Sequence, residues 1–374
     1  MRNVVIAGYA RSPFHFAHKG ELRKVRPDEM AAQVIEALIK QTGLPAQDIE
    51  DVIVGCAFPE GEQGFNVGRL IGLLGHLPIS AAGATVNRFC GSSMQAIHMA
   101  AGAIQMNAGE VFVCGGIESM TRVPMGGYNP MPSPKLMKDM PAAYMSMGQT
   151  AENVARQYQI TRSEQEEFAV GSHAKAAAAQ AGGRLDAEIV AINGVAKDGC
   201  IRAGTSKEAL AGLKPAFMEE GTVTAGTSSP LTDGASAVLV TSEDYAKAHG
   251  LKPLAKIRAI AVAGCAPEVM GLGPIGASKK ALKRAGIAAK DLDIVELNEA
   301  FASQAIASMR DLDIPVEKVN LDGGAIALGH PLGATGARIT GKAAALLKRE
   351  GKGLALSTQC IGGGQGIATV LEAV

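Results

Sequence analysis

The segment Gly43-Leu44-Pro45-Ala46-Gln47-Asp48-Ile49-Glu50 has a counterpart in Gly286-Ile287-Ala288-Ala289-Lys290-Asp291-Leu292-Asp293. In each copy a helical pattern ends at the glycine, and a run typical of a β-strand follows. Two shorter echoes come in the same order: Val86-Asn87 resembles Val319-Asn320, and Cys114-Gly115-Gly116 resembles Cys360-Ile361-Gly362-Gly363. We therefore predict two copies of one α/β unit, the alternative being a generic similarity between helix-loop-strand segments.

Short β-branched runs alternate with Ala-rich helical patterns along the chain, as is typical of an α/β fold. Strands are predicted at Val4–Gly8, Asp51–Val54, Thr85–Val86, Val111–Val113, Ala237–Val240, Ile257–Val262, Ile294–Glu296, Leu354–Ser357 and Ile367–Leu371. Helices are predicted at Met30–Gln41, Ser92–Met106, Ser163–Gln180, Ser278–Ala285, Phe301–Arg310 and Gly336–Arg349.

The two copies differ in spacing because a segment rich in Met, Pro and charge follows Ser119 and ends near Gly221. Long insertions of this kind usually carry function. The predicted domains are a first half (1–119 with 221–249), an inserted loop domain (120–220) and a second half (250–374).

Composition excludes several classes of protein. Of 374 residues, 47% are hydrophobic, and 36 basic side chains balance 36 acidic ones, so neither disorder nor nucleic-acid binding is expected. The six cysteines lack CxxC spacing, which argues against a metal site or a disulfide framework. Val4–Ala10 is too short for a signal peptide, and no stretch is long enough to span a membrane. The expected location is the cytoplasm.

Cys90 lies in Asn87-Arg88-Phe89-Cys90-Gly91-Ser92-Ser93-Met94, after a predicted strand and before a predicted helix. A sulfur at a helix N-terminus is favoured as the thiolate, and small residues after a nucleophile suit a tight strand-to-helix turn. The alternative is a buried structural cysteine.

Three other junctions carry candidate residues. His330 stands in Gly329-His330-Pro331-Leu332-Gly333, a rigid loop before a helix, whereas the other six histidines have contexts typical of surface or packing residues. Cys360 precedes Ile361-Gly362-Gly363-Gly364-Gln365-Gly366; its glycines predict close approach of a substrate and free N–H groups for an oxyanion, or else a plain hairpin. Asn298, in Asn298-Glu299-Ala300-Phe301, either orients a water or histidine or caps the next helix.

Taken together and in this order, these four motifs resemble the signature set of the thiolase family, and the resemblance includes Thr224-Ala225-Gly226-Thr227-Ser228-Ser229. It implies two βαβαβαββ halves forming a five-layer α-β-α-β-α sandwich with an inserted loop domain. It also implies dimers or tetramers of identical subunits, and a hydratase/dehydrogenase partner is possible in this family.

The resemblance implies acyl transfer to Cys90, with His330 as base and Cys360 handling the α-carbon proton. One oxyanion site would use His330 with a water held by Asn298, and the other the N–H groups of Cys90 and Gly362. CoA and acyl-CoA thioesters would be the substrates, with no metal or redox cofactor. The CoA-binding positions implied are Arg202, Phe217, Ala225 and Ser229.

Short-chain biosynthetic thiolases carry a His before the Met-Gly that corresponds to Met147-Gly148, where this chain has Ser146. The sequence is therefore most similar to degradative 3-ketoacyl-CoA thiolases of fatty-acid β-oxidation, which cleave 3-ketoacyl-CoA with CoA to acetyl-CoA and a shortened acyl-CoA. The alternative is an acetyl-CoA acetyltransferase that condenses two acetyl-CoA to acetoacetyl-CoA.

Three other functions are compatible with parts of the pattern. A 3-ketoacyl synthase would carry His or Asn in place of Cys360. A non-catalytic lipid carrier would not need both cysteines, the histidine and the asparagine. A cysteine hydrolase built on Cys90, His330 and Asn298 would give Cys360 no role.

Overall fold

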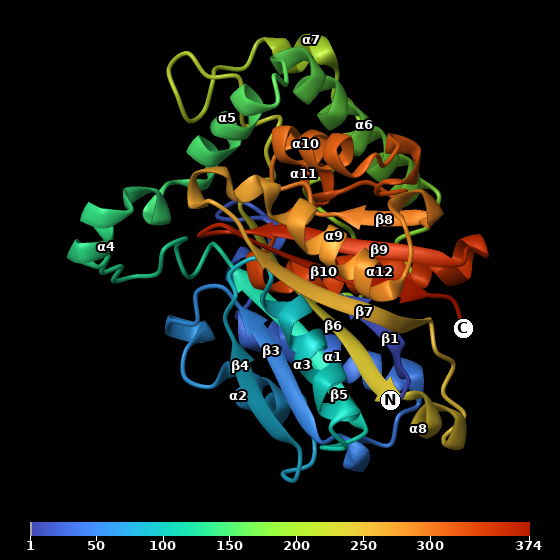
Figure 1. Ribbon diagram of the computed structural model, residues 1–374. Coiled ribbons are helices and arrows are strands. Elements are labelled where there is room, and N and C mark those ends of the chain that lie inside the picture. The colour runs from blue at the N-terminus through green and yellow to red at the C-terminus, as the bar shows by residue number, and fades with distance from the viewer. Residues whose placement is uncertain (1) are drawn as a thin grey trace.

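The computed structural model describes residues 2–374, in which two similar halves lie one above the other and helices cover the second half (Figure 1). The strands of the first half follow the order β4-β3-β5-β6-β1, and those of the second half the order β7-β10-β9-β8. The first-half strands are β1 (Val4–Arg11), β3 (Asp51–Cys56), β4 (Ala82–Val86), β5 (Val111–Ser119) and β6 (Thr232–Ser242). The second-half strands are β7 (Ala255–Gly264), β8 (Ile294–Leu297), β9 (Leu354–Ile361) and β10 (Gln365–Glu372).

Strands β1 and β7 pair through Val5–Lys256 and Ile6–Ala255 and so join the strands of both halves into one ten-stranded sheet. The strands of the first half are called the first sheet below, and those of the second half the second sheet. In each half the βα-connected strands pair in parallel, β3 with β4 and β5, and β8 with β9. The strand that follows by a hairpin or through the insertion pairs antiparallel, as β6 does with β5 and β10 with β9. A short strand, β2 (His15–Phe16), joins the edge of β6.

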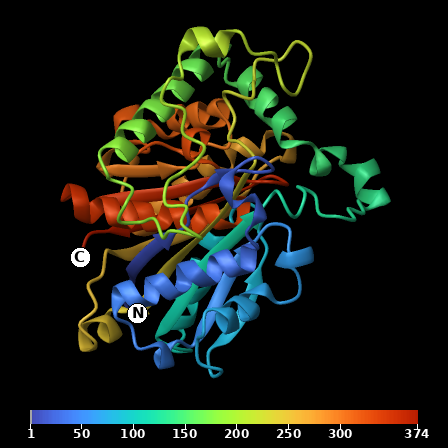
Figure 2. The same cartoon turned by 180° about the vertical axis from the view of Figure 1, so that it is seen from behind.

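Three apolar cores separate five layers and so confirm the predicted sandwich. One core lies between the first sheet and α1 (Pro27–Thr42) with α2 (Val67–Leu74), which cover its outer face (Figure 2). A second core surrounds the central helices α3 (Ser92–Gln105) and α12 (Thr335–Glu350), between the two sheets. The third lies under α9 (Gly273–Ala285) and α10 (Ala302–Leu312), on the outside of the second sheet.

The duplication is confirmed, but only the first sequence echo is in register. Gly43 and Gly286 both end a helix in the left-handed conformation, with φ of 69° and 68°. At the same distance along the chain from these glycines, Asp51 pairs with Phe112 in the first half and Ile294 pairs with Ala355 in the second, so these pairs are equivalent.

The two later echoes do not correspond in space. Counting on from these pairs, the counterpart of Cys114 is Ser357, and the counterpart of Cys360 is Ile117. Similarly, Val319 bridges to Val295 as Gly83 does to Val52, so Val86 is not its counterpart. Short motifs of glycine and β-branched residues are common at strand ends, and their recurrence here does not mark equivalent positions in the two halves.

The chain between β5 and β6 forms helices of its own, namely α4 (Pro134–Asp139), α5 (Met147–Gln157), α6 (Arg162–Ala181) and α7 (Lys207–Ala211). This segment starts from the first half, but its helices pack against the second half (Figure 1). Helices α5 and α6 both contact α10, and α6 also contacts α11 (Ala325–Leu328). A capping box formed by Thr161 and Glu164 begins α6. The insertion therefore lies above the loops that carry Asn298 and His330.

Predicted helices agree with the structure to within a few residues, but several elements were missed or cut short. The helices α2, α5 and α8 (Glu243–Ala248) were not predicted. Strand β9 continues to Ile361 because β10 pairs with it as far as Gln365–Ile361, so Cys360 lies within a strand rather than after one. No helix among residues 2–374 is long and apolar enough to cross a membrane.

Candidate active site

Four segments converge where the two halves meet: the turn before α3, the loop after β8, the loop before α12 and the end of β9. They carry Cys90, Asn298, His330 and Cys360 respectively. The N-terminal ends of α3 and α12 touch here, since Ala337 N donates to Ser93 Oγ over 2.8 Å. A Cβ on Gly336 would lie 2.3 Å from Met94 N, so only glycine permits this contact.

The turn that carries Cys90 is fixed by its own polar side chains. Phe89 N donates to Asn87 Oδ1 over 2.8 Å, and Asn87 Nδ2 donates to the Ala57 carbonyl over 3.0 Å. Phe89 adopts a φ of 43°, which is unusual for a bulky residue and marks a strained turn. Ser92 Oγ donates back to the Phe89 carbonyl and so closes the turn. Cys90 consequently stands, partly exposed, at the tip of a rigid strand-to-helix turn.

The Cys90 sulfur is a thiol in the resting protein. Burial raises the pKa of the Cys90 thiol to about 12, with a further contribution from the Glu118 carboxylate, while the N–H of Gly362 opposes the shift. The expectation that the helix N-terminus would favour a thiolate is therefore wrong for the resting state, because desolvation outweighs the helix dipole. Cys90 needs a base.

His330 is held as a neutral imidazole of defined tautomer. Thr335 Oγ1 donates to the Pro331 carbonyl over 3.1 Å and therefore accepts from His330 Nδ1, which lies 2.6 Å away. This assignment puts the ring's lone pair on Nε2, where it faces the Asn298 side-chain amide. Burial, helped by Arg338, lowers the pKa of His330 to about 3, so the ring is uncharged at neutral pH.

Asn298 orients His330 and does not cap a helix. Its Nδ2 lies 3.3 Å from His330 Nε2, and its Oδ1 is buried without a partner among residues 2–374. The residue that caps α10 is Phe301, which makes no side-chain capping bond. A buried amide oxygen without a partner is uncommon and is the kind of group that a substrate or an ordered water satisfies.

Cys360 faces Cys90 from the opposite half. Burial raises the pKa of the Cys360 thiol well above its usual value, and the nearby Cys90 adds to the shift. Cys360 packs with Ala300, Phe301 and Met147 beside the Asn298 loop. No hydrogen bond joins Cys90 to His330 in the described part of the chain, as is common before a substrate tightens such contacts.

The glycines after Cys360 serve three purposes. Gly363 and Gly364 have φ of 80° and 85° and form the β9–β10 hairpin. Gly366 is required by packing, because a Cβ there would lie 1.9 Å from the Gly273 carbonyl oxygen. Only Gly362 presents its N–H to the Cys90 sulfur.

Sequence reasoning missed two residues that hold the site together. The buried Glu118, at the end of β5, accepts hydrogen bonds from Ala57 N (2.8 Å) and Gly333 N (2.9 Å), and so ties the first half to the His330 loop. Gln359 Nε2 donates to the Cys90 carbonyl. Neither residue lies in a recognisable sequence motif. The only signal was the glycine-rich loop around Gly333, which indicated that another segment approaches this loop closely.

The four residues assigned to CoA fall into two groups. Arg202 and Ala225 line one small cavity, with His173 and Phe16, and the Arg202 guanidinium lies 5.0 Å from the Phe16 ring centroid. His173 was taken for a packing residue, but its Nδ1 accepts from Arg202 N and thus shapes this cavity. Ser229 Oγ donates to the Ala300 carbonyl, and Phe217 packs edge-on against Phe301 at 5.8 Å.

The fold and site together define an α/β protein in which two thiols, Cys90 and Cys360, lie close to each other at the site that also holds a neutral histidine. The family profiles described as "Thiolase, N-terminal domain" and "Thiolase, C-terminal domain" match residues 4–244 and 251–373. The chain belongs to the thiolase family.

Named relatives cover the chain from end to end. It is 49% identical to a 3-ketoacyl-CoA thiolase of Marinomonas sp. (strain MWYL1), over 100% of this chain and 98% of that protein. It is 45% identical to a 3-ketoacyl-CoA thiolase of Bacillus subtilis (strain 168), over 100% of both. The crystal structure of the Bacillus anthracis acetyl-CoA acetyltransferase superposes with a TM-score of 0.92 at 39% identity, covering 100% of this chain and 99% of that one.

Proposed function

We propose that this protein is a 3-ketoacyl-CoA thiolase, an acetyl-CoA C-acyltransferase that uses CoA to cleave 3-ketoacyl-CoA into acetyl-CoA and a shortened acyl-CoA. The observation that carries the proposal is the pair of thiols, Cys90 and Cys360, brought face to face beside a neutral histidine. A hydrolase would need one thiol and a water, whereas cleavage of a carbon–carbon bond needs a second acid over the leaving carbon.

In the first half-reaction His330 Nε2 accepts the Cys90 proton, and the thiolate attacks the 3-keto carbonyl. The bond between C2 and C3 then breaks, its electron pair forms the acetyl-CoA enolate, and the Cys360 thiol protonates C2. In the second half-reaction the Cys360 thiolate takes the proton of a CoA thiol, which attacks the acyl group. His330 returns its proton to Cys90 as the acyl group departs.

Both oxyanions of this sequence have donors nearby. The Asn298 amide and protonated His330 would stabilise the thioester enolate, with a water held by Asn298. The N–H groups of Cys90 and Gly362 would bind the tetrahedral oxyanion on Cys90, and the proximity of Gly362 N–H to the sulfur supports this assignment. The reaction is proposed to need no metal or redox cofactor.

For CoA, we propose that Arg202 binds the nucleotide end and Ser229 the pantetheine arm, with Phe217 and Ala225 as walls. Arg202 is an exposed cation beside the small cavity that Ala225 also lines, which suits a phosphate-bearing ligand. Phe217 is held over Gly148 at the entrance of the insertion, since a Cβ on Gly148 would collide with its ring at 2.0 Å.

A CoA-dependence assay tests the reaction. Loss of 3-ketoacyl-CoA absorbance should require added CoA and should yield acetyl-CoA and a shortened acyl-CoA in equal amounts. Loss at the same rate without CoA would instead identify a hydrolase.

The second candidate is condensation of two acetyl-CoA, which the name of the Bacillus anthracis structure favours. Names of the 45–49% identical relatives and Ser146 before Met147 favour the degradative direction. Comparing kcat/KM for thiolysis of acetoacetyl-CoA and of a longer 3-ketoacyl-CoA decides between them: a degradative enzyme should accept the longer chain.

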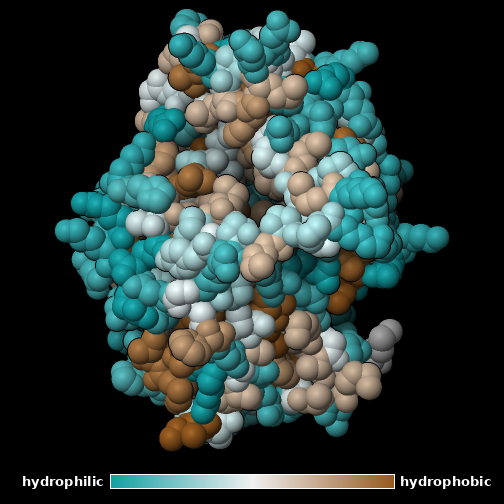
Figure 3. Space-filling view, turned by 90° about the vertical axis from the view of Figure 1, so that its left-hand side faces the viewer, coloured by the Kyte–Doolittle hydropathy of each residue, from teal (hydrophilic) through white to brown (hydrophobic). Residues whose placement is uncertain are grey.

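We also propose that the enzyme is a homo-oligomer whose subunits meet through the first half. Strand β4 is the edge of its sheet, and exposed apolar side chains surround it on α2 and beyond, including Phe65, Leu73 and Ile79 at 95%, 44% and 82% exposure. Hydrophobic surface gathers on this face in the lower part of Figure 3. Such an edge invites pairing with another strand. A monomer in sedimentation at micromolar concentration would contradict this.

A cytoplasmic location is proposed as well. All six cysteines are free thiols, and proteins of oxidising compartments seldom leave so many unpaired. Fractionation of the source cells tests the location.

A further inference from the structure

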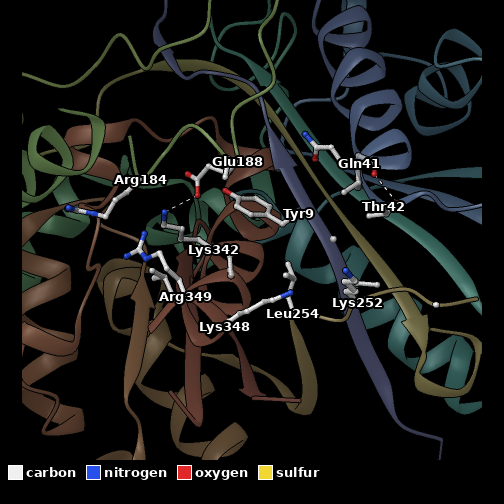
Figure 4. Close-up of a pocket in the computed structure, with 17 residues that line it drawn as sticks. Tyr9, Gln41, Thr42, Arg184, Glu188, Lys252, Leu254, Lys342, Lys348 and Arg349 are labelled. Atoms are coloured by element: carbon white, nitrogen blue, oxygen red, sulfur yellow. Dashed lines mark hydrogen bonds and ion pairs between the residues drawn. The ribbon is translucent and has the colours of Figure 1, made fainter. Parts of the chain in front are cut away.

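A cavity of about 580 Å³ opens far from Cys90, where both halves and the insertion meet (Figure 4). Its volume lies within the roughly 300–1,000 Å³ of ordinary ligand pockets. The helix α12 links the two places: its first residue, Thr335, bonds His330, and its last turn lines the cavity. At about 1.5 Å per residue this separates them by roughly 20 Å.

The lining is strongly basic. Five cationic side chains and one carboxylate face the cavity: Arg184, Lys252, Lys342, Lys348, Arg349 and Glu188. Three of the cations gather around the buried Asp322, which lies 3.0 Å from Arg184, 2.7 Å from Lys342 and 2.5 Å from Arg349. Glu188 also pairs with Lys342 over 2.9 Å.

Two cations are left over. Lys252, in the linker between the halves, and Lys348, on α12, form no ion pair with any of residues 2–374. The cavity therefore has a positive surplus that the protein itself does not neutralise. Cations in the last turn of a helix complement its dipole, which accounts for Lys348 but not for Lys252 on a separate segment.

Tyr9 provides an independent sign of a missing partner. It lines the cavity with only 7% of its surface exposed, and its hydroxyl is buried with no hydrogen-bond partner among residues 2–374. Figure 4 shows its hydroxyl end directed toward Glu188 and Lys342. Burial raises the pKa of Tyr9 well above its usual value, so the hydroxyl stays protonated and is a hydrogen-bond donor without an acceptor among residues 2–374.

The rest of the wall is uncharged. Leu38, Leu254 and Leu346 are apolar, and Gln41 and Thr42 add hydrogen-bonding groups at the end of α1. We propose that this cavity binds a small organic anion that carries two or more phosphate charges, with its phosphates on the Lys252 and Lys348 ammonium groups and its hydroxylated body against α1. Because the cavity is lined by both halves and the insertion, the ligand would bridge all three parts of the chain.

Isothermal titration calorimetry tests the proposal, and the lysine variants distinguish binding in this cavity from binding at the CoA site. Pyrophosphate serves as a probe of charge alone, and fructose 1,6-bisphosphate as a probe with an organic body. Both should bind saturably with one site per chain, the sugar bisphosphate more tightly, and the affinity should fall as salt rises.

The lysine variants change exposed side chains, and Tyr9→Phe keeps the buried ring and removes only its hydroxyl. Lys252→Gln/Lys348→Gln should weaken both probes at least about tenfold, as loss of charge-assisted hydrogen bonds implies. Tyr9→Phe should weaken them by about two- to tenfold, and the matched control Lys290→Gln, at an exposed lysine of the second half, should change nothing. Melting temperatures confirm that each variant is folded.

Absence of saturable binding of pyrophosphate by the wild-type protein would overturn the proposal. Equal affinity in the double variant and in Lys290→Gln would do so too, because it would place the probe elsewhere. Binding of pyrophosphate without any gain for the sugar bisphosphate would refute an organic ligand.

Discussion

Thr335→Val should slow acyl transfer although Thr335 does not reach the substrate. Its hydroxyl accepts from His330 Nδ1 over 2.6 Å and donates to the Pro331 carbonyl, and this chain of two hydrogen bonds keeps the ring's lone pair on Nε2, the atom proposed to take the Cys90 proton. Valine has nearly the same shape but no acceptor. A buried N–H without a partner costs about 1–3 kcal/mol, so the ring would favour the tautomer that carries its proton on Nε2.

If that whole penalty appears in the transition state, kcat/KM for thiolysis should fall by roughly 5- to 150-fold. The assay is the rate of acetylation of Cys90 by acetyl-CoA, followed by intact mass in single turnover, because this step isolates the base. Thr335→Ser keeps the hydroxyl and should restore most of the rate, whereas a purely structural defect would affect both variants. A Thr335→Val enzyme within twofold of wild type would show that Thr335 does not set the tautomer.

Four further outcomes follow from the site. Cys90→Ala should form no acetyl adduct with acetyl-CoA; an adduct of the same mass would reassign the nucleophile. Cys360→Ala should still become acetylated at Cys90 but should lose thiolysis and exchange of the acetyl α-protons with deuterated water by about 10²–10⁴-fold, and near-normal exchange would leave the Gly362 turn as the functional element. Since the pKa of His330 is about 3 and that of Cys90 about 12, acetylation should be nearly independent of pH between about 5 and 9, and a rise with a midpoint near 6.5 would contradict the assigned histidine environment. Burial likewise lowers the pKa of His98 to about 3, so between about pH 6.5 and pH 3 only the unfolded chain takes up protons at His98 and His330. The free energy of unfolding should therefore fall from pH 7 to pH 5. In urea unfolding, His98→Gln should make that fall shallower.

How far the sequence predicted this structure depended on the range of the interaction. Local periodicity and caps predict five of the helices, namely α1, α3, α6, α9 and α12. The four catalytic candidates are predicted from their positions at junctions between secondary-structure elements. Two of the four then depend on partners remote in sequence, since Glu118 holds the His330 loop and Gln359 the Cys90 turn, while Thr335, five residues after His330, holds its imidazole. Such partners are ordinary polar residues, and no motif surrounds them.

Electrostatic expectations failed for a similar reason. A helix N-terminus after Cys90 is visible in the sequence, but the burial that raises the pKa of the thiol comes from residues remote in sequence, among them Ala17, Ala57 and Leu332. The basic cavity was also invisible, because Lys252 and Lys348 are separated by almost a hundred positions and meet only through packing of the linker against α12.

The duplication explains why the site lies where it does. The helices α3 and α12 are counterparts in the two halves, and both begin with a turn that follows a strand or loop of its own sheet. Their N-terminal ends meet through Ser93 and Ala337, with Gly336 permitting the approach, so the turns before them face each other. The first turn carries Cys90 and the second His330. The proposed nucleophile and its proposed base thus come from one structural unit used twice, while Asn298 and Cys360 come only from the second copy. The division predicts that a first half expressed alone would present Cys90 without its base, without the second acid and with only its own N–H as an oxyanion donor, and should be inert toward acetyl-CoA.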